Sequence, residues 1–297
     1  MDRQKKLPIA AFIATRNEEK NIGKCIDSLW PVQEIHVLDS KSSDATASLA
    51  AERGAIVHQF DYTGRYPKKR QWGLQTVATT QPWILLLDAD EEVPEELWQE
   101  ISEAIENQAA SHAAYMITKG FWFLGKQFRF GGFSHSAVLL FQRGRGRFED
   151  LDELVDSGLD MEVHERVLID GTVGSLKTPL IHNDFKGLTN YLDKHNRYAT
   201  WEAAVRIGYI RGASWGKDSI SPKLFGNSQE RRRFLKQNAC RLPFESWAWF
   251  AYHYLIRLGF LEGRRGLIAS QIRSQYISNV RAKMYEILLA ERKTNHR

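Results

Sequence analysis

The chain has 297 residues, of which 43% are hydrophobic and 11% aromatic, an ordinary globular composition that excludes general disorder. Its net charge of +5 is unevenly distributed. Residues 206–297 hold 18 basic and 6 acidic side chains, net +12, and residues 1–205 hold 23 and 30, net −7, which indicates two different functional surfaces.

The two cysteines, Cys25 and Cys240, are too few for a disulfide framework or a cysteine metal site, and they fit a reducing cytoplasm. Residues 1–7 are polar and charged, so we expect no signal peptide. The longest apolar run, 247–256, is too short to cross a bilayer, so we expect no membrane-spanning segment.

Short apolar runs alternate with amphipathic segments along the first ninety residues. The runs predict strands at 9–14, 35–38, 55–58 and 83–87, and the segments predict helices ending near residues 29 and 54 and a third over 68–78. Strands that alternate with helices of about ten residues predict an α/β fold with a mostly parallel, doubly wound sheet.

The fourth predicted strand ends abruptly in two aspartates, Asp88 and Asp90. Ligands of open α/β sheets bind at the carboxyl ends of the strands. On extended backbone the two side chains would share a face, with about 6–7 Å between their Cα atoms, and would converge on one cation. Such oxygen ligands suit Mg²⁺ or Mn²⁺ carrying a substrate's phosphates. A solvated acidic turn before the next helix is the alternative.

The loop after the first strand argues against two common nucleotide sites. Residues 15–19 contain no glycine, so the dinucleotide fingerprint and the P-loop are both missing. A sugar nucleotidyltransferase would need a glycine-rich, basic loop here. Asp39 ends the second strand, where it can accept hydrogen bonds from a base N–H or a ribose hydroxyl. Capping the following helix is the alternative role for Asp39.

Four segments, 14–19, 37–46, 69–74 and 87–91, fall in the order and spacing of one enzyme family. With them the chain resembles the family 2 glycosyltransferases, inverting enzymes with the GT-A fold. Within this family it is most similar to the bacterial lipopolysaccharide core glucosyltransferases. The likeness continues through 163–165, 179–182, 196–198 and 259–263, and so spans nearly the whole chain.

The resemblance implies a nucleotide-sugar site. Its base and ribose contacts would come from Thr15, Arg16, Asn17, Glu18 and Asp39, with Arg70 near the base or the diphosphate. Asp88 and Asp90 would contact the ribose and the divalent metal, Mg²⁺ or Mn²⁺. The chemistry agrees, since a leaving nucleoside diphosphate gains negative charge that a metal and an arginine stabilise. A surface helix charge is the alternative for Arg70.

Further strands are expected around 114–117 and 138–141, with a hairpin near residue 125, as antiparallel additions to the sheet. An inverting enzyme needs a carboxylate that takes the proton of the acceptor hydroxyl. Glu165, beside His164 and Arg166, is the candidate that the resemblance supports. The acidic run 149–153, with Asp150 foremost, is the alternative.

His182 follows a short strand and is a candidate third metal ligand through its neutral imidazole. A hydrogen-bonded structural histidine is the alternative. We expect residues 1–186 to form the catalytic domain and residues 187–297 a helical, basic region, with helices over 188–207, from 230 and from 243.

The aromatic residues of 244–258, together with Arg257, Arg264, Arg265 and Arg273, have the composition of a helix at a membrane interface. At roughly 1 kcal/mol for each basic residue near an anionic leaflet, half of these charges would retain the protein there. Packing against the catalytic domain or a second subunit is the alternative. No nucleic-acid module is recognisable, so we expect no nucleic-acid partner.

These observations predict an inverting, metal-dependent enzyme that moves a hexose, by resemblance glucose from UDP-glucose, to a lipopolysaccharide-core or lipid-linked acceptor. It would act at the inner face of the cytoplasmic membrane. A sugar nucleotidyltransferase and a non-catalytic nucleotide-sugar or membrane-binding scaffold are the alternatives. The nucleotide, the acceptor and the oligomeric state are left open.

Overall fold

A computed structural model describes residues 5–64, 66–106, 112–150, 166–182, 185, 187–211, 222–226, 230–231, 234, 238 and 242–295. They belong to two compact units. Unit 1 holds the described residues up to 121, those of 134–150 and those of 166–182; unit 2 holds 122–133 and the described residues from 185 on. The expected division at residue 186 stays a prediction.

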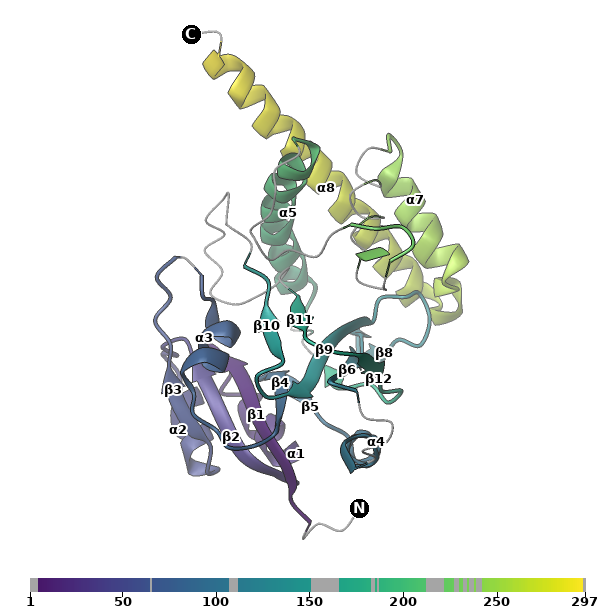
Figure 1. The fold of residues 1–297 in the computed structure, drawn as a ribbon. Coiled ribbons are helices and arrows are strands. Elements are labelled where there is room, and N and C mark those ends of the chain that lie inside the picture. Colours follow the sequence, from purple (N-terminus) through teal and green to yellow (C-terminus); the bar gives the residue numbers. More distant parts are fainter. Residues whose placement is uncertain are drawn as a thin grey trace. The chain divides into compact units, whose positions relative to one another are not determined.

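Unit 1 is built on a seven-stranded sheet in the order β12-β6-β9-β4-β1-β2-β3 (Figure 1). Its strands are β1 (Leu7–Thr15), β2 (Val32–Asp39), β3 (Ile56–Gln59), β4 (Trp83–Asp88), β6 (Ala114–Lys119), β9 (His135–Gln142) and β12 (Val173–Ser175). Strands β3, β2, β1 and β4 are parallel, whereas β9 is antiparallel to both β4 and β6. Strand β6 therefore runs in the same direction as β4.

Shorter elements complete unit 1. Its helices are α1 (Ile22–Ser28), α2 (Thr46–Glu52), α3 (Lys69–Thr76) and α4 (Glu95–Glu106). Two small antiparallel pairs join β5 (Glu91–Glu92) to β13 (Ile181–His182) and β10 (Gly146–Phe148) to β11 (Val167–Ile169). The predicted GT-A class, a mostly parallel sheet with flanking helices and a helical C-terminal region, is confirmed.

The centre of the sheet is buried because β1 and β4 carry continuous apolar runs with neighbours on both sides. Helix α3 approaches the sheet closely at Gly73. A Cβ atom there would come within 2.4 Å of Leu38 Cδ1 on β2. The missing side chain thus lets α3 lie against the sheet, and this fixes the residues of its first turn near the strand ends.

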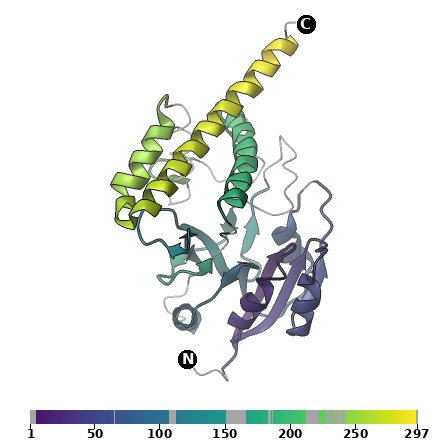
Figure 2. The ribbon, with the colours of Figure 1, turned by 180° about the vertical axis from the view of Figure 1, so that it is seen from behind.

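Unit 2 is largely helical. It contains α5 (Leu188–Ile210), α7 (Glu245–Ala251), the π-helical turn η2 (Tyr252–Ile256), the 3₁₀ turn η3 (Gly259–Glu262) and α8 (Arg264–Asn295), with the hairpin β7 (Trp122–Phe123) and β8 (Lys126–Gln127). Helix α8 lies between α5 and α7 (Figure 2). The helix expected from residue 230 falls mostly outside the described residues. In the part of the chain that the structure describes, every helix is too short or too polar to span a membrane.

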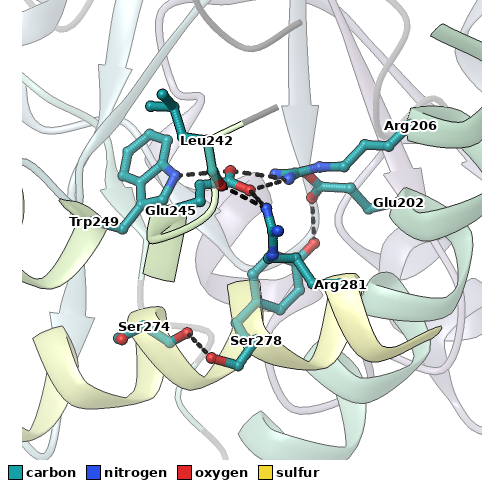
Figure 3. A network of polar contacts seen from close by, with 9 residues as sticks. Glu202, Arg206, Leu242, Glu245, Trp249, Ser274, Ser278 and Arg281 are labelled. Atoms are coloured by element: carbon teal, nitrogen blue, oxygen red, sulfur yellow. Dashed lines mark hydrogen bonds and ion pairs between the residues drawn. The ribbon is translucent and has the colours of Figure 1, made fainter. Parts of the chain in front are cut away.

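A buried ionic network links the three helices of unit 2 (Figure 3). Arg206 of α5 donates to Glu202 at 2.8 Å and to Glu245 of α7 at 2.8 Å, and the hydroxyl of Tyr276 on α8 donates to Glu202. Trp249 Nε1 also donates to Glu245, at 3.2 Å. Burial and the Glu202 charge raise the pKa of Tyr276, so its hydroxyl keeps the proton that it donates.

Candidate functional site

The strand register brings the predicted site residues to one edge of the sheet. Thr15 pairs with Asp39 at the ends of β1 and β2, and Ala14 pairs with Asp88 at the end of β4. Lys119 ends β6, which runs parallel to β4, so its side chain reaches the same edge. The ends of β2, β1 and β4, and of β6 beyond the antiparallel β9, thus gather polar groups where open α/β sheets bind ligands.

Asp88 is held by two cations. Arg70 on α3 donates to its Oδ1, and Lys119 Nζ lies 2.8 Å from its Oδ2. Burial would raise the pKa of Asp88, but the charges of Arg70 and Lys119 outweigh it and hold the pKa well below the usual range of an aspartate. Asp88 is therefore an anion that fixes one arginine and one lysine at the strand end.

Glu91 is buried and contacts both Asp88 and Lys119. Its Oε2 accepts the backbone N–H of Asp88 at 2.9 Å, and its Oε1 lies 2.6 Å from Lys119 Nζ. Burial raises the pKa of the fully buried Glu91, and the negative Asp88 adds to this effect against the attraction of Lys119. For Lys119 the balance is reversed: burial opposes its charge, but Asp88 and Glu91 raise its pKa, so it stays a cation.

Asp90 faces a different partner from Asp88. It lies in the turn after β4, and its Oδ1 is 3.6 Å from His182 Nε2. The pairing of β13 with β5 sets His182 opposite Glu91, beside this turn. The two predicted aspartates thus have separate neighbours, since β4 ends at Asp88 and the extended spacing does not continue to Asp90.

A divalent metal at this edge would need several oxygen or nitrogen ligands close together. Among the described residues, no three His, Cys, Asp or Glu side chains gather into a metal-binding group. Asp90 and His182 nevertheless supply a carboxylate oxygen and an imidazole nitrogen near one point. Mg²⁺ and Mn²⁺ are commonly bound by one or two carboxylates together with phosphate oxygens and waters, so Asp90, with His182 beside it, fits a metal that arrives with a diphosphate.

The loops after β1 and β2 hold each other. The backbone N–H groups of Asn17 and Glu18 donate to Ser42 Oγ and Thr46 Oγ1, both at 2.8 Å, and Asn17 Oδ1 accepts the N–H of Ser43 at 2.8 Å. Asn17 has a φ of 54°, a left-handed conformation that asparagine tolerates. The predicted loop is thus a fixed wall of the site, and Arg16 stands exposed on it.

Asp39 is fully buried and its carboxylate is engaged within the chain. Its Oδ2 accepts the N–H of Ser42 and the amide of Gln59, each at 3.0 Å, and its Oδ1 accepts the Ser42 hydroxyl. These contacts hold the turn that follows β2. They favour a structural part for Asp39, and contact with a nucleoside stays a prediction.

The predicted base, Glu165, lies outside the described residues, as does most of the alternative run. Glu149 at the start of that run is fully buried, and its Oε2 accepts the N–H of Arg166 at 3.0 Å. Glu149 therefore links the residue after β10 to the residue before β11. Asp150 is half-buried.

Two cations of the site were missing from the sequence prediction. Lys119 follows an apolar run that gives no sign of strand direction, so its approach to Asp88 could not be inferred. Lys69 is buried, and its Nζ donates to the carbonyl of Thr15 at 2.8 Å. Its position next to Arg70 on a helix that packs against the sheet is the signal that could have revealed it.

The chain is similar to known glycosyltransferases. The family model described as Glycosyl transferase family 2 matches residues 10–161. The lipopolysaccharide core biosynthesis glycosyltransferase LpsC of Rhizobium meliloti is 31% identical over 74% of this chain and 79% of its own. An uncharacterized glycosyltransferase of Rickettsia typhi is 27% identical over 89% of this chain and 82% of its own.

Among solved structures, that of S. aureus TarS residues 1–349 is similar over 96% of the present chain and 92% of the TarS chain. The sequence identity is 12% and the TM-score is 0.45. The family rests on the sequence relationships instead. The matched region contains the interlocked loops, Arg70, Lys119 and the aspartate pair, and the relationship to LpsC extends over most of the chain. The chain accordingly belongs to glycosyltransferase family 2 and is a glycosyltransferase.

Proposed function

We propose that this glycosyltransferase is an inverting, metal-dependent enzyme that transfers a hexose, glucose from UDP-glucose, to a lipopolysaccharide-core or lipid-linked acceptor. The observation that carries the proposal is the group of Arg70, Lys119 and Asp88 at the sheet edge, beside Asp90 and His182. The name of LpsC supports the class of acceptor.

Arg70 is the residue best suited to the leaving group. Its guanidinium is held by Asp88, so its direction is fixed before a substrate binds. As the bond between the anomeric carbon and the diphosphate oxygen breaks, negative charge grows on the diphosphate, and a preorganised arginine fork stabilises it at no reorganisation cost. Lys119 adds positive charge from the other side of Asp88.

Asp90 and His182 would hold the divalent metal, whose chemistry is to neutralise the diphosphate oxygens. Asp88 would act through the two cations that it orients, and the Thr15–Glu18 loop with Asp39 would border the nucleoside. Glu165 would take the proton of the acceptor hydroxyl as its oxygen attacks the anomeric carbon from the face opposite the diphosphate. Attack from that face, with the diphosphate leaving from the other, inverts the configuration at the anomeric carbon.

A lipid-linked acceptor would be met at the inner face of the cytoplasmic membrane, so we include peripheral membrane association in the proposal. The basic balance of residues 206–297 supports an anionic surface as partner.

The test is donor binding by calorimetry with UDP-, GDP- and dTDP-sugars, with and without Mn²⁺. Wild type should bind the UDP-sugar only with Mn²⁺, and Asp90→Ala should lose that binding. Asp27→Ala, which changes an exposed aspartate elsewhere in unit 1, is the matched control. Release of nucleoside diphosphate with an acceptor would support the transferase; release of pyrophosphate, or no donor binding by folded protein, would refute the proposal.

A further inference from the structure

Unit 2 has an unusual surface where α7, η2 and η3 lead into α8. We name residues 242–265 the apolar tip. Six of its apolar side chains are more than half exposed: Leu242, Phe244, Trp247, Leu255, Ile256 and Leu261. Phe244 and Trp247 each reach 73% exposure and Ile256 reaches 71%. Apolar side chains scattered singly on a surface are normal, whereas this many within twenty residues mark an interaction site.

The interior of the tip is polar, so the usual arrangement is inverted. Glu245, His253 and Glu262 are all buried. Glu262 Oε1 accepts the N–H groups of Arg129 and Phe130, at 2.7 and 2.9 Å, and His253 Nδ1 donates to the carbonyl of Gly131 at 2.6 Å. A segment whose polar side chains point inward and whose apolar side chains point outward is suited to an environment less polar than water.

The tip is also rigidly built. Leu258 has a φ of 60°, which turns the chain sharply between η2 and η3. A Cβ atom on Gly266 would come within 1.9 Å of the carbonyl oxygen of Gly259, so the start of α8 touches η3 directly. The exposed apolar side chains are therefore held in place, and their exposure is a property of the fold.

The charges of the tip select the partner. Its two acidic residues, Glu245 and Glu262, are buried, whereas its arginines, Arg257, Arg264 and Arg265, are all exposed. The outward charge is therefore positive throughout. Aromatic and aliphatic side chains bordered by arginines match the boundary between acyl chains and anionic headgroups.

We propose that the apolar tip docks on an anionic phospholipid bilayer. Trp247, Phe244 and Ile256 enter the headgroup layer, while Arg257 and Arg264 contact lipid phosphates. This inference rests on the membrane association in the proposed function and deepens it by assigning the surface. It involves no residue of the nucleotide-sugar site, so the two can fail separately.

Vesicle flotation of the full chain tests the proposal. The vesicles are phosphatidylcholine alone, or phosphatidylcholine mixed with phosphatidylglycerol. Wild type should bind the anionic vesicles and bind the neutral ones weakly. Replacing Trp247 and Ile256 together by serine should lower the partition coefficient about tenfold or more, because both side chains lose their transfer into the bilayer. Arg264→Gln should lower it about fivefold, and only on anionic vesicles.

Tyr285→Ser is the matched control, since Tyr285 is 64% exposed on α8 outside the tip; its binding should equal that of wild type. Thermal unfolding and UDP-sugar binding are measured on every variant. Unchanged donor binding with lost vesicle binding supports the proposal. The proposal is overturned if wild type does not bind the vesicles, or if the double variant binds them as well as wild type does. A wild-type dimer that the double variant converts to monomer would also overturn it, because the tip would then join two copies.

Discussion

Lys119 and Asp88, 31 residues apart in the chain, meet at 2.8 Å because β9 is inserted antiparallel between their two strands. The same ammonium also reaches Glu91 at 2.6 Å. One lysine therefore balances two carboxylates, of which Glu91 has no exposed surface. Arg70 and Lys119 hold the Asp88 carboxylate and Glu91 holds the Asp88 backbone N–H, so the group is preorganised.

Lys119→Met should destabilise unit 1 and weaken donor binding. Removing the cation takes one of two cations from Asp88 and the ion-pair partner from the buried Glu91, and breaking a buried ion pair costs about 3–5 kcal/mol. The measurement is urea unfolding together with calorimetry of UDP binding. Lys119→Arg, which keeps the charge, should recover most of both. A change below about 1 kcal/mol in Lys119→Met would show that the pair behaves as a solvated one.

Arg70→Lys should lower kcat about 10- to 100-fold and change KM for the donor less. Lysine keeps the charge but lacks the planar fork that can hold Asp88 and a diphosphate oxygen together. Arg70→Gln should lower kcat further, by about 100- to 1000-fold, as loss of a donor to a developing anion does. Steady-state kinetics measures both.

Arg53→Gln is the control for Arg70. It removes an arginine at the end of α2 that donates to the carbonyl of Leu49 at 3.2 Å. A fall in donor affinity alone, with kcat retained in Arg70→Gln, would contradict a role for Arg70 in stabilising the leaving group.

The parallel half of the sheet was predictable from sequence, and the other half only in part. The runs 9–14 and 83–87 are apolar throughout, because β1 and β4 are covered on both faces, and such runs are easily read. The run around 138–141 also predicted a strand, but an apolar run does not reveal its partner or direction. Lys119 was missed for that reason, since its role depends on the order β6-β9-β4.

The directions of the Asp88 and Asp90 side chains were also not predictable from sequence. Asp88 and Asp90 were expected to share a face, which holds only while the backbone stays extended. Strand β4 ends at Asp88, so Asp90 turns toward His182. The end of the strand cannot be inferred from spacing alone, because it depends on contacts such as that of the Glu91 carboxylate with the N–H of Asp88.

The stability of unit 2 should depend on pH through His253. Its ring lies between Phe133 and Trp249, and burial lowers its pKa to about 4, with the charges of Arg273 and Arg257 adding to the effect. Above its ordinary pKa of 6.5 the imidazole is neutral in both states. Between pH 6.5 and 4 His253 is protonated in the unfolded chain but neutral in the folded one. The free energy of unfolding therefore falls as the pH falls, by about 3 kcal/mol in all.

Urea unfolding from pH 4.5 to 7.5 measures this dependence. His253→Asn should flatten it, since asparagine can still donate to the Gly131 carbonyl but does not titrate. The comparison uses the slope against pH, because the substitution also changes packing. Gln275→Asn, which changes an exposed and non-titrating residue of α8, is the control and should keep the wild-type slope. Equal slopes in His253→Asn and wild type would contradict the assignment.

Arg206→Met should strongly destabilise unit 2. Arg206 is the cation shared by Glu202 and Glu245, and its loss leaves two buried carboxylates near Tyr276, Trp249 and the more distant Arg281. A buried charge without its partner costs about 3–5 kcal/mol, and the two repelling anions bring the loss toward the upper end. Urea unfolding followed by tryptophan fluorescence measures it.

The double change Arg206→Met with Glu245→Gln separates charge from packing. It removes one cation and one anion, so the remaining network is closer to neutral, and the stability should lie between those of Arg206→Met and wild type. If the double variant is no more stable than Arg206→Met, the packing of the Arg206 side chain between α5 and α7 determines the effect. Because the network joins α7 to α5 and α8, Arg206→Met should also reduce vesicle binding through a loosened apolar tip, and the double variant should restore it in proportion to its stability.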